Sequence, residues 1–134
     1  MSASFEATFP STPPGVGAMR REIAAFAAQC GMDGDGIEAV RLAVSEAATN
    51  AVVHAYREAA GDLLVRATVA GDELLVVVCD TGLGLGPRPD SPGLGLGMPL
   101  IASVTSRFRV VSDESGTEVH MTFPLAAGDG GASA

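Results

Sequence analysis

The sequence contains no lysine and no tryptophan, and aromatic residues make up only 4% of it. Its eight basic residues are therefore all arginines, and they are scattered along the chain rather than grouped. Sixteen acidic residues give a net charge of −8, which disfavours direct binding to a nucleic acid. An acidic surface fits a soluble protein or one that docks on a basic partner. Because aromatic residues are few, the core must be built from aliphatic side chains.

Cysteines and long apolar runs are also scarce. Cys30 and Cys79 are too few and too far apart for a zinc site or a disulfide framework. No apolar run approaches the roughly 20 residues of a membrane-spanning helix. The opening residues, MSASFEATFP, lack the basic and apolar regions of a signal peptide. We therefore expect a cytoplasmic protein without a membrane segment.

The pattern of apolar residues and turn signals predicts one α+β domain over residues 1–125. The tail AAGDGGASA (126–134) has nothing to pack and is expected to be disordered. The order of elements favours a two-layer sandwich, a mixed and mostly antiparallel sheet with all helices on one face. The apolar run LLVVVC (74–79) indicates a central strand buried on both faces. The expected strands are 4–9, 62–70, 73–80, 107–113 and 117–123, and the expected helices are 13–30, 37–57 and 98–106.

A stretch rich in glycine and proline, TGLGLGPRPDSPGLGLG (81–97), is too long for an ordinary connection. It follows the apolar strand and ends in GLGLG (93–97), where a helix begins. Glycines let the backbone approach a ligand, and a helix N-terminus attracts anions, so the stretch suits phosphate binding. A flexible surface loop is the alternative. The stretch is neither a dinucleotide fingerprint nor a P-loop, since the βαβ context and the GK[ST] motif are missing.

Asp80 ends the apolar strand, where a carboxylate is costly to bury unless it is paired. Two interpretations fit this position. Asp80 caps the turn after the strand, or it accepts a hydrogen bond from an exocyclic amine such as that of adenine.

The segment SEAATNAVVHAY (45–56) places Glu46, Asn50 and His54 four residues apart, on one face of a helix. An amide oxygen such as that of Asn50 is a suitable ligand for Mg²⁺, which takes further ligands from phosphates. Glu46, one turn earlier, could accept a proton or orient a nucleophile. His54 either joins this site or only packs and hydrogen-bonds at the end of the helix.

These features, in this order, resemble the ATP-binding domain of histidine kinases, Hsp90, MutL and type II topoisomerases, which is called the Bergerat or GHKL fold. EAATNAVVHAY resembles its N box, DTGLG its first glycine box and GLGLG its second. GTEVHMTF (116–123) resembles its closing Gly-Thr segment beside the adenine. The resemblance covers about residues 5–124. The compact form is similar to the anti-sigma factor serine/threonine kinases of bacterial partner switching.

The resemblance implies a role for each matching residue. Glu46 would be the base toward a serine of an anti-anti-sigma (STAS) protein, Asn50 would hold Mg²⁺, and Asp80 would bind the adenine of ATP. The N box has no basic residue for the phosphates, and Arg57 or Arg88 could supply that charge. The remaining nucleotide-binding positions would be His54, Gly82, Gly84, Gly93, Gly95, Gly97 and Thr117.

Three functions are compatible with this resemblance. The first is a Mg-ATP-dependent serine/threonine kinase that also sequesters a sigma factor, and Glu46 favours it. The second is an ATP- or ADP-gated binding module that transfers no phosphate, which has less need of a carboxylate beside the metal. The third is a detached histidine-kinase catalytic domain, which needs a phosphoacceptor helix pair that this sequence does not contain. Protein partners are implied by the first two, and a homodimer is left open.

Overall fold

The computed structural model describes residues 3–55, 61–80, 98–113 and 116–125, and only the backbone within residues 50–55, 98–99 and 112–113. Three helices and five strands follow one another along this part of the chain. They are β1 (Ser4–Pro10), α1 (Pro13–Gln29), α2 (Gly34–Ala55), β2 (Asp62–Ala70), β3 (Glu73–Asp80), α3 (Met98–Val104), β4 (Arg107–Asp113) and β5 (Gly116–Pro124).

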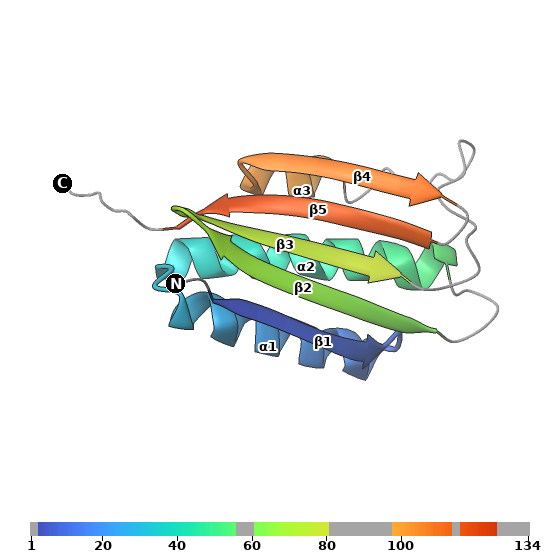
Figure 1. The fold of residues 1–134 in the computed structure, drawn as a ribbon. Helices are drawn as coiled ribbons and strands as arrows, with labels where there is room; N and C mark the ends of the chain where they lie inside the picture. Colours follow the sequence, from blue (N-terminus) through green and yellow to red (C-terminus); the bar gives the residue numbers. More distant parts are fainter. Residues whose placement is uncertain (1–2, 56–60, 81–97, 114–115, 126–134) are drawn as a thin grey trace.

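The five strands form one sheet in the order β1-β2-β3-β5-β4, with β3 at its centre. Each neighbouring pair is antiparallel. The helices lie together on one face of the sheet (Figure 1). The α+β two-layer sandwich is therefore confirmed, and the described sheet contains no parallel pair that would make it mixed.

The ends of the two long helices show how the local sequence fixes them. The Thr12 hydroxyl accepts a hydrogen bond from the Gly15 N–H at 3.1 Å, as expected of an N-cap followed by proline. The second helix begins at Gly34, earlier than the predicted residue 37, because the Asp33 carboxylate caps it. Asp33 Oδ1 accepts a hydrogen bond from the Gly36 N–H at 2.8 Å. The run of Asp and Gly is thus a helix start rather than a separate turn.

Strands β2 and β3 form a hairpin. The tight turn between the strands is made by Gly71 and Asp72, and Gly71 has a φ of +63°, which suits glycine. The register pairs Ala70 with Glu73 next to the turn and Leu63 with Asp80 at the far end. Asp80 is therefore fixed at the end of the sheet opposite to the hairpin turn.

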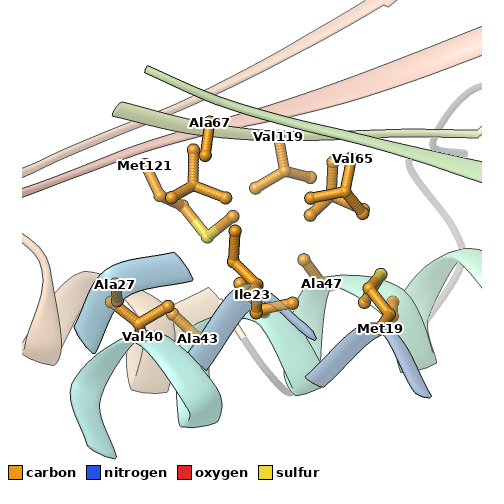
Figure 2. Packing of buried hydrophobic residues seen from close by; sticks show 14 of the residues in the cluster. Met19, Ile23, Ala27, Val40, Ala43, Ala47, Val65, Ala67, Val119 and Met121 are labelled. Atoms are coloured by element: carbon orange, nitrogen blue, oxygen red, sulfur yellow. The ribbon is translucent and has the colours of Figure 1, made fainter. Parts of the chain in front are cut away.

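The core is aliphatic, as expected, and lies between the sheet and the helices. Small and branched side chains of α2 face the sheet, and side chains of α1 pack beside them (Figure 2). Burying aliphatic surface of this kind is the main favourable term in folding. The fully buried side chains of largest volume are Phe123, Met19, Ile23, Leu63, Leu74, Ile101, Met121, Val40, Val44, Val65, Val76 and Val78.

The prediction that β3 is buried on both faces is wrong. Leu74, Val76 and Val78 are buried against the helices, whereas Leu75 on the outer face is 36% exposed and Val77 is partly exposed. The strand is central, but helices cover only one face of the described sheet (Figure 1). An apolar run in a sheet with one covered face leaves apolar side chains on the other face.

Replacing Leu74 with alanine should destabilise the protein by about 2–5 kcal/mol, because the side chain is fully buried opposite Phe123. Urea denaturation followed by circular dichroism measures the change. Leu42→Ala is the control, since Leu42 is 37% exposed on α2 and should change stability by less than about 0.5 kcal/mol. Equal losses in the two variants would contradict the assignment of Leu74 to the core.

Candidate functional site

Helix α2 places Glu46 at the edge of its buried face. Ala47 and Ala48, which follow Glu46, are at most 2% exposed, and Glu46 itself is half-buried. Among the described residues, no hydrogen bond or ion pair engages the Glu46 carboxylate. A carboxylate in this position remains able to accept a proton from a bound molecule.

The helix continues through Asn50 and His54 to Ala55. The backbone thus confirms the helical spacing on which the stripe of Glu46, Asn50 and His54 rests. The side chains of Asn50 and His54 lie outside the described residues. Their roles stay predictions.

Asp80 is the last residue of β3 and is only 9% exposed. It alternates with the outward-facing Cys79, so it belongs to the same face of the sheet as Val76 and Val78, the face covered by the helices. Its register partners are Leu63 on β2 and Thr117 on β5. Asp80 and Thr117 each have at least one polar or electrostatic interaction. A carboxylate is therefore buried at the end of the sheet, beside the Gly-Thr segment.

Gly116 begins β5 and makes an unusually close approach to Asp80. Its φ of +138° lies where residues with side chains are strained. A Cβ atom at this position would lie 2.3 Å from the Asp80 carbonyl oxygen and 3.1 Å from Asp80 Oδ1. Glycine is thus required here, and it leaves bare backbone beside the carboxylate.

Helix α2, strand β3 and strand β5 meet at one end of the molecule. Helix α2 packs on β3 and β5. In Figure 1 the C-terminal end of α2, the arrowhead of β3 and the start of β5 lie at the same end. The fold therefore brings the helix that carries Glu46, Asn50 and His54 to the strands that carry Asp80 and Thr117.

The two glycine boxes lie outside the described residues, and so do Arg57 and Arg88. The structure nevertheless shows the two elements that the segment 81–97 connects. It leaves at Asp80, the last residue of β3, and returns at Met98, the first residue of α3. Gly82, Gly84, Gly93, Gly95 and Gly97 keep the roles that the resemblance implies as predictions.

The thiol next to Asp80 does not take part in this site. Cys79 is on the outer face of the sheet, and both cysteines are free. Burial raises the pKa of the Cys79 thiol, and the nearby Glu118 carboxylate raises it further, against the opposing effect of Arg66. The thiol is therefore protonated at neutral pH and is a poor nucleophile.

Sequence reasoning missed two residues that shape the site. Gly116 was named only as part of the Gly-Thr segment, although it adjoins the buried carboxylate. Arg20 on α1 was not singled out, and its guanidinium donates a hydrogen bond to the Ser45 hydroxyl at 3.1 Å. This bond links α1 to α2 immediately before Glu46. Of these two residues, only Gly116 had a signal in the sequence, which was its place in the Gly-Thr segment.

The described residues place a buried carboxylate, that of Asp80, beside the backbone of Gly116, which carries no side chain. Within the described ranges, no three His, Cys, Asp or Glu side chains gather closely enough to hold a metal ion. Mg²⁺ does not need such a cluster, because it takes one or two protein oxygens and completes its shell with phosphate oxygens and waters. None of the helices in the described part of the chain is long and apolar enough to cross a membrane.

Comparison with known proteins identifies the family of the domain. The model of the histidine kinase-like ATPase domain matches residues 9–123. The chain is 38% identical to the serine-protein kinase RsbW of Bacillus licheniformis over 130 residues, covering 84% of this chain and 80% of that protein. It is 31% identical to the anti-sigma F factor of Clostridium acetobutylicum over 114 residues, covering 76% and 80% of the two chains.

Solved structures share the fold. The structure of the RsbU and RsbW domains of Rv1364c from Mycobacterium tuberculosis aligns with a TM-score of 0.72 at 24% identity, covering 92% of this chain and 32% of that one. The histidine kinase domain of EL346 from Erythrobacter litoralis aligns with a TM-score of 0.59 at 25% identity, covering 83% and 61%. The predicted GHKL architecture is therefore confirmed, and the chain belongs to the histidine kinase-like ATPase family, in the group that contains the RsbW serine-protein kinases and the anti-sigma F factors.

Proposed function

We propose that this protein is an anti-sigma factor-type serine kinase. It binds ATP with Mg²⁺, transfers the γ-phosphate to a serine of an anti-anti-sigma STAS protein, and also binds a sigma factor. The names of its relatives, serine-protein kinase RsbW and anti-sigma F factor, support both activities. The observation that carries the proposal is Glu46, a half-buried carboxylate that no described residue engages, on the helix that leads to the end of the sheet where Asp80 lies.

Asp80 and Gly116 would hold the adenine. The Asp80 carboxylate would accept a hydrogen bond from the exocyclic amine, and Gly116 presents backbone without a side chain next to that carboxylate. Thr117, the register partner of Asp80, completes this end of the site. Guanine presents a carbonyl where adenine presents an amine, and it would leave the buried carboxylate facing an acceptor. The site should therefore select ATP over GTP.

Asn50 would supply an oxygen to Mg²⁺, and the metal would neutralise charge on the phosphates. The glycines on both sides of the segment 81–97 would donate backbone N–H groups to the phosphates. Arg57 and Arg88 are the arginines proposed to lie near them. These assignments follow the family resemblance and are open to the tests below.

Glu46 would act on the incoming serine. It accepts the proton of the serine hydroxyl as the serine oxygen bonds to the γ-phosphorus and the bond from phosphorus to the bridging oxygen breaks. Positioning and charge stabilisation dominate in such transfers, so Glu46 must be held firmly. The hydrogen bond from Arg20 to Ser45 and the buried Ala47 and Ala48 hold this turn of α2 in place.

Asp80→Asn should weaken ATP binding and reduce the preference for ATP over GTP. Loss of a hydrogen bond to a charged group costs about 1.5–3 kcal/mol, which is roughly 10–150-fold in affinity. Isothermal calorimetry with both nucleotides measures this. Asp72→Asn is the control, because Asp72 lies in the hairpin turn at the opposite end of β3. Equal affinity of the wild type for ATP and GTP would refute the adenine assignment.

Asn50→Ala should abolish or strongly weaken Mg²⁺-dependent ATP binding while the fold is kept. The measurement is calorimetry with and without Mg²⁺, and circular dichroism checks the fold. Gln29→Ala removes an exposed amide at the end of α1 and should change nothing. An unchanged Mg²⁺ dependence in Asn50→Ala would remove this residue from the metal site.

Glu46→Gln should bind Mg-ATP and the protein partner normally but transfer phosphate about 10²–10⁴-fold more slowly, which is the usual contribution of a general base. Glutamine keeps the size and helix propensity of the side chain. The assay follows labelled phosphate from ATP to a purified STAS protein that binds the wild type. Glu38→Gln is the control, since Glu38 lies on the same helix in a surface pair with Arg41.

Two outcomes of this assay would count against a kinase. One is a Glu46→Gln variant that transfers phosphate at the wild-type rate. The other is a wild-type protein that binds ATP and the STAS protein without labelling it. The second result would favour the ATP-gated binding module instead.

A further inference from the structure

The chain turns from β1 into α1 at a corner that the sequence makes rigid. The two prolines that open the helix fix their own backbone φ angles, and the Thr12 hydroxyl accepts a hydrogen bond from the Gly15 N–H. A Cβ atom at Gly15 would clash with the carbonyl oxygen of Pro10, so glycine lets the helix start this close to the end of the strand. Ser11 lies inside this corner and is only 8% exposed.

Ser11 is joined to Gly61, which lies 50 residues later in the chain. The Ser11 N–H and the Ser11 hydroxyl both donate to the Gly61 carbonyl oxygen, at 3.1 and 2.8 Å. The Gly61 N–H donates back to the hydroxyl oxygen of Ser11 at 3.2 Å. One serine thus satisfies both backbone polar groups of Gly61, and its hydroxyl takes part in two of these hydrogen bonds.

The Ser11–Gly61 connection closes the ladder between β1 and β2. The last register pair of that ladder is Pro10 with Asp62, and Ser11 and Gly61 are the next residues outward. In Figure 1 the arrowheads of β1 and β3 lie at the same end of the sheet, so this is the end at which Asp80 lies. Strand ends open more readily than strand centres. A buried side chain that bonds the last rung therefore keeps the ladder closed here.

The inner-face row of residues next to this connection carries the buried carboxylate. The row passes through four register partners, which are Phe9, Leu63, Asp80 and Thr117. Phe9 and Leu63 are at most 5% exposed, and Leu63 follows Gly61 by two residues. A connection that holds Gly61 therefore also holds the β2 neighbour of Asp80.

We propose that Ser11 is a positioning residue of the nucleotide site. This inference rests on the proposed binding of ATP at Asp80. Ser11 holds the start of β2, and β2 in turn holds Asp80 where the exocyclic amine of adenine meets it. When the last rung opens, Asp80 is correctly placed in only a fraction of the molecules. The apparent affinity for ATP falls in proportion to that fraction.

Ser11→Ala tests this role, and Ser106→Ala is its matched control. The first change removes the hydroxyl and leaves the backbone bond from Ser11 to Gly61. The Ser106 hydroxyl and the Ser106 N–H likewise both donate to one carbonyl oxygen, that of Thr122, at 3.0 and 2.8 Å. Thr122 pairs with Leu75, toward the hairpin turn of β2 and β3. The control therefore removes the same kind of bond far from the proposed site.

Ser11→Ala should weaken Mg-ATP binding about 2–10-fold, the size expected for the loss of one hydrogen bond. In the phosphate-transfer assay the KM for ATP should rise by the same factor while kcat is unchanged, because Ser11 acts on binding. Ser106→Ala should bind Mg-ATP like the wild type. Isothermal calorimetry measures the affinities, and urea denaturation shows whether the two variants lose similar stability.

Amide hydrogen exchange at Gly61 gives an independent readout. Exchange there should be faster in Ser11→Ala than in the wild type, and Mg-ATP should slow it, because coupling between two sites is reciprocal. Wild-type ATP affinity in Ser11→Ala would overturn the proposal. An equal loss of affinity in Ser106→Ala would also overturn it, as would exchange at Gly61 that ignores Mg-ATP in a protein that binds it. A wild type that binds no ATP would instead refute the proposed function, and this inference with it.

Discussion

The rest of the structure depends on how closely α2 lies against the centre of the sheet. The residues of α2 that face β3 and β5 are small, and Ala43, Ala47 and Ala48 are at most 2% exposed. Figure 2 shows Ala43 and Ala47 below the sheet side chains Val65, Ala67, Val119 and Met121. A helix with larger side chains on this face would stand farther from the sheet. Glu46 would then lie farther from the end of β3.

A second constraint follows at the end of the sheet. A carboxylate as buried as Asp80 is costly unless its surroundings satisfy it, and here the start of β5 is packed against it without a side chain at Gly116. The backbone of Gly116 approaches Asp80 too closely for any side chain to fit between them. The pairing of β5 with β3 and the burial of Asp80 therefore depend on the same glycine.

Local signals in the sequence were enough to predict the helix that begins at residue 13 and the strands on both sides of Gly71, because each depends on neighbouring residues. Contacts between distant segments were not accessible in this way. The closeness of Gly116 to Asp80 depends on strand pairing across 36 positions, and the strand order places β5 between β3 and β4. The outer face of β3 was predicted to be buried because an apolar run does not reveal what covers it.

The central claim is that ATP binds on the helix side of the sheet, at the end of the molecule where α2 and β3 end and β5 begins. Amide NMR spectra recorded during a titration with Mg-ATP test it most directly. The account predicts the largest shifts at Glu46, Asp80, Gly116 and Thr117, with little change at Gly71 in the hairpin turn. Shifts concentrated at the hairpin turn or on the outer face of the sheet would contradict the account.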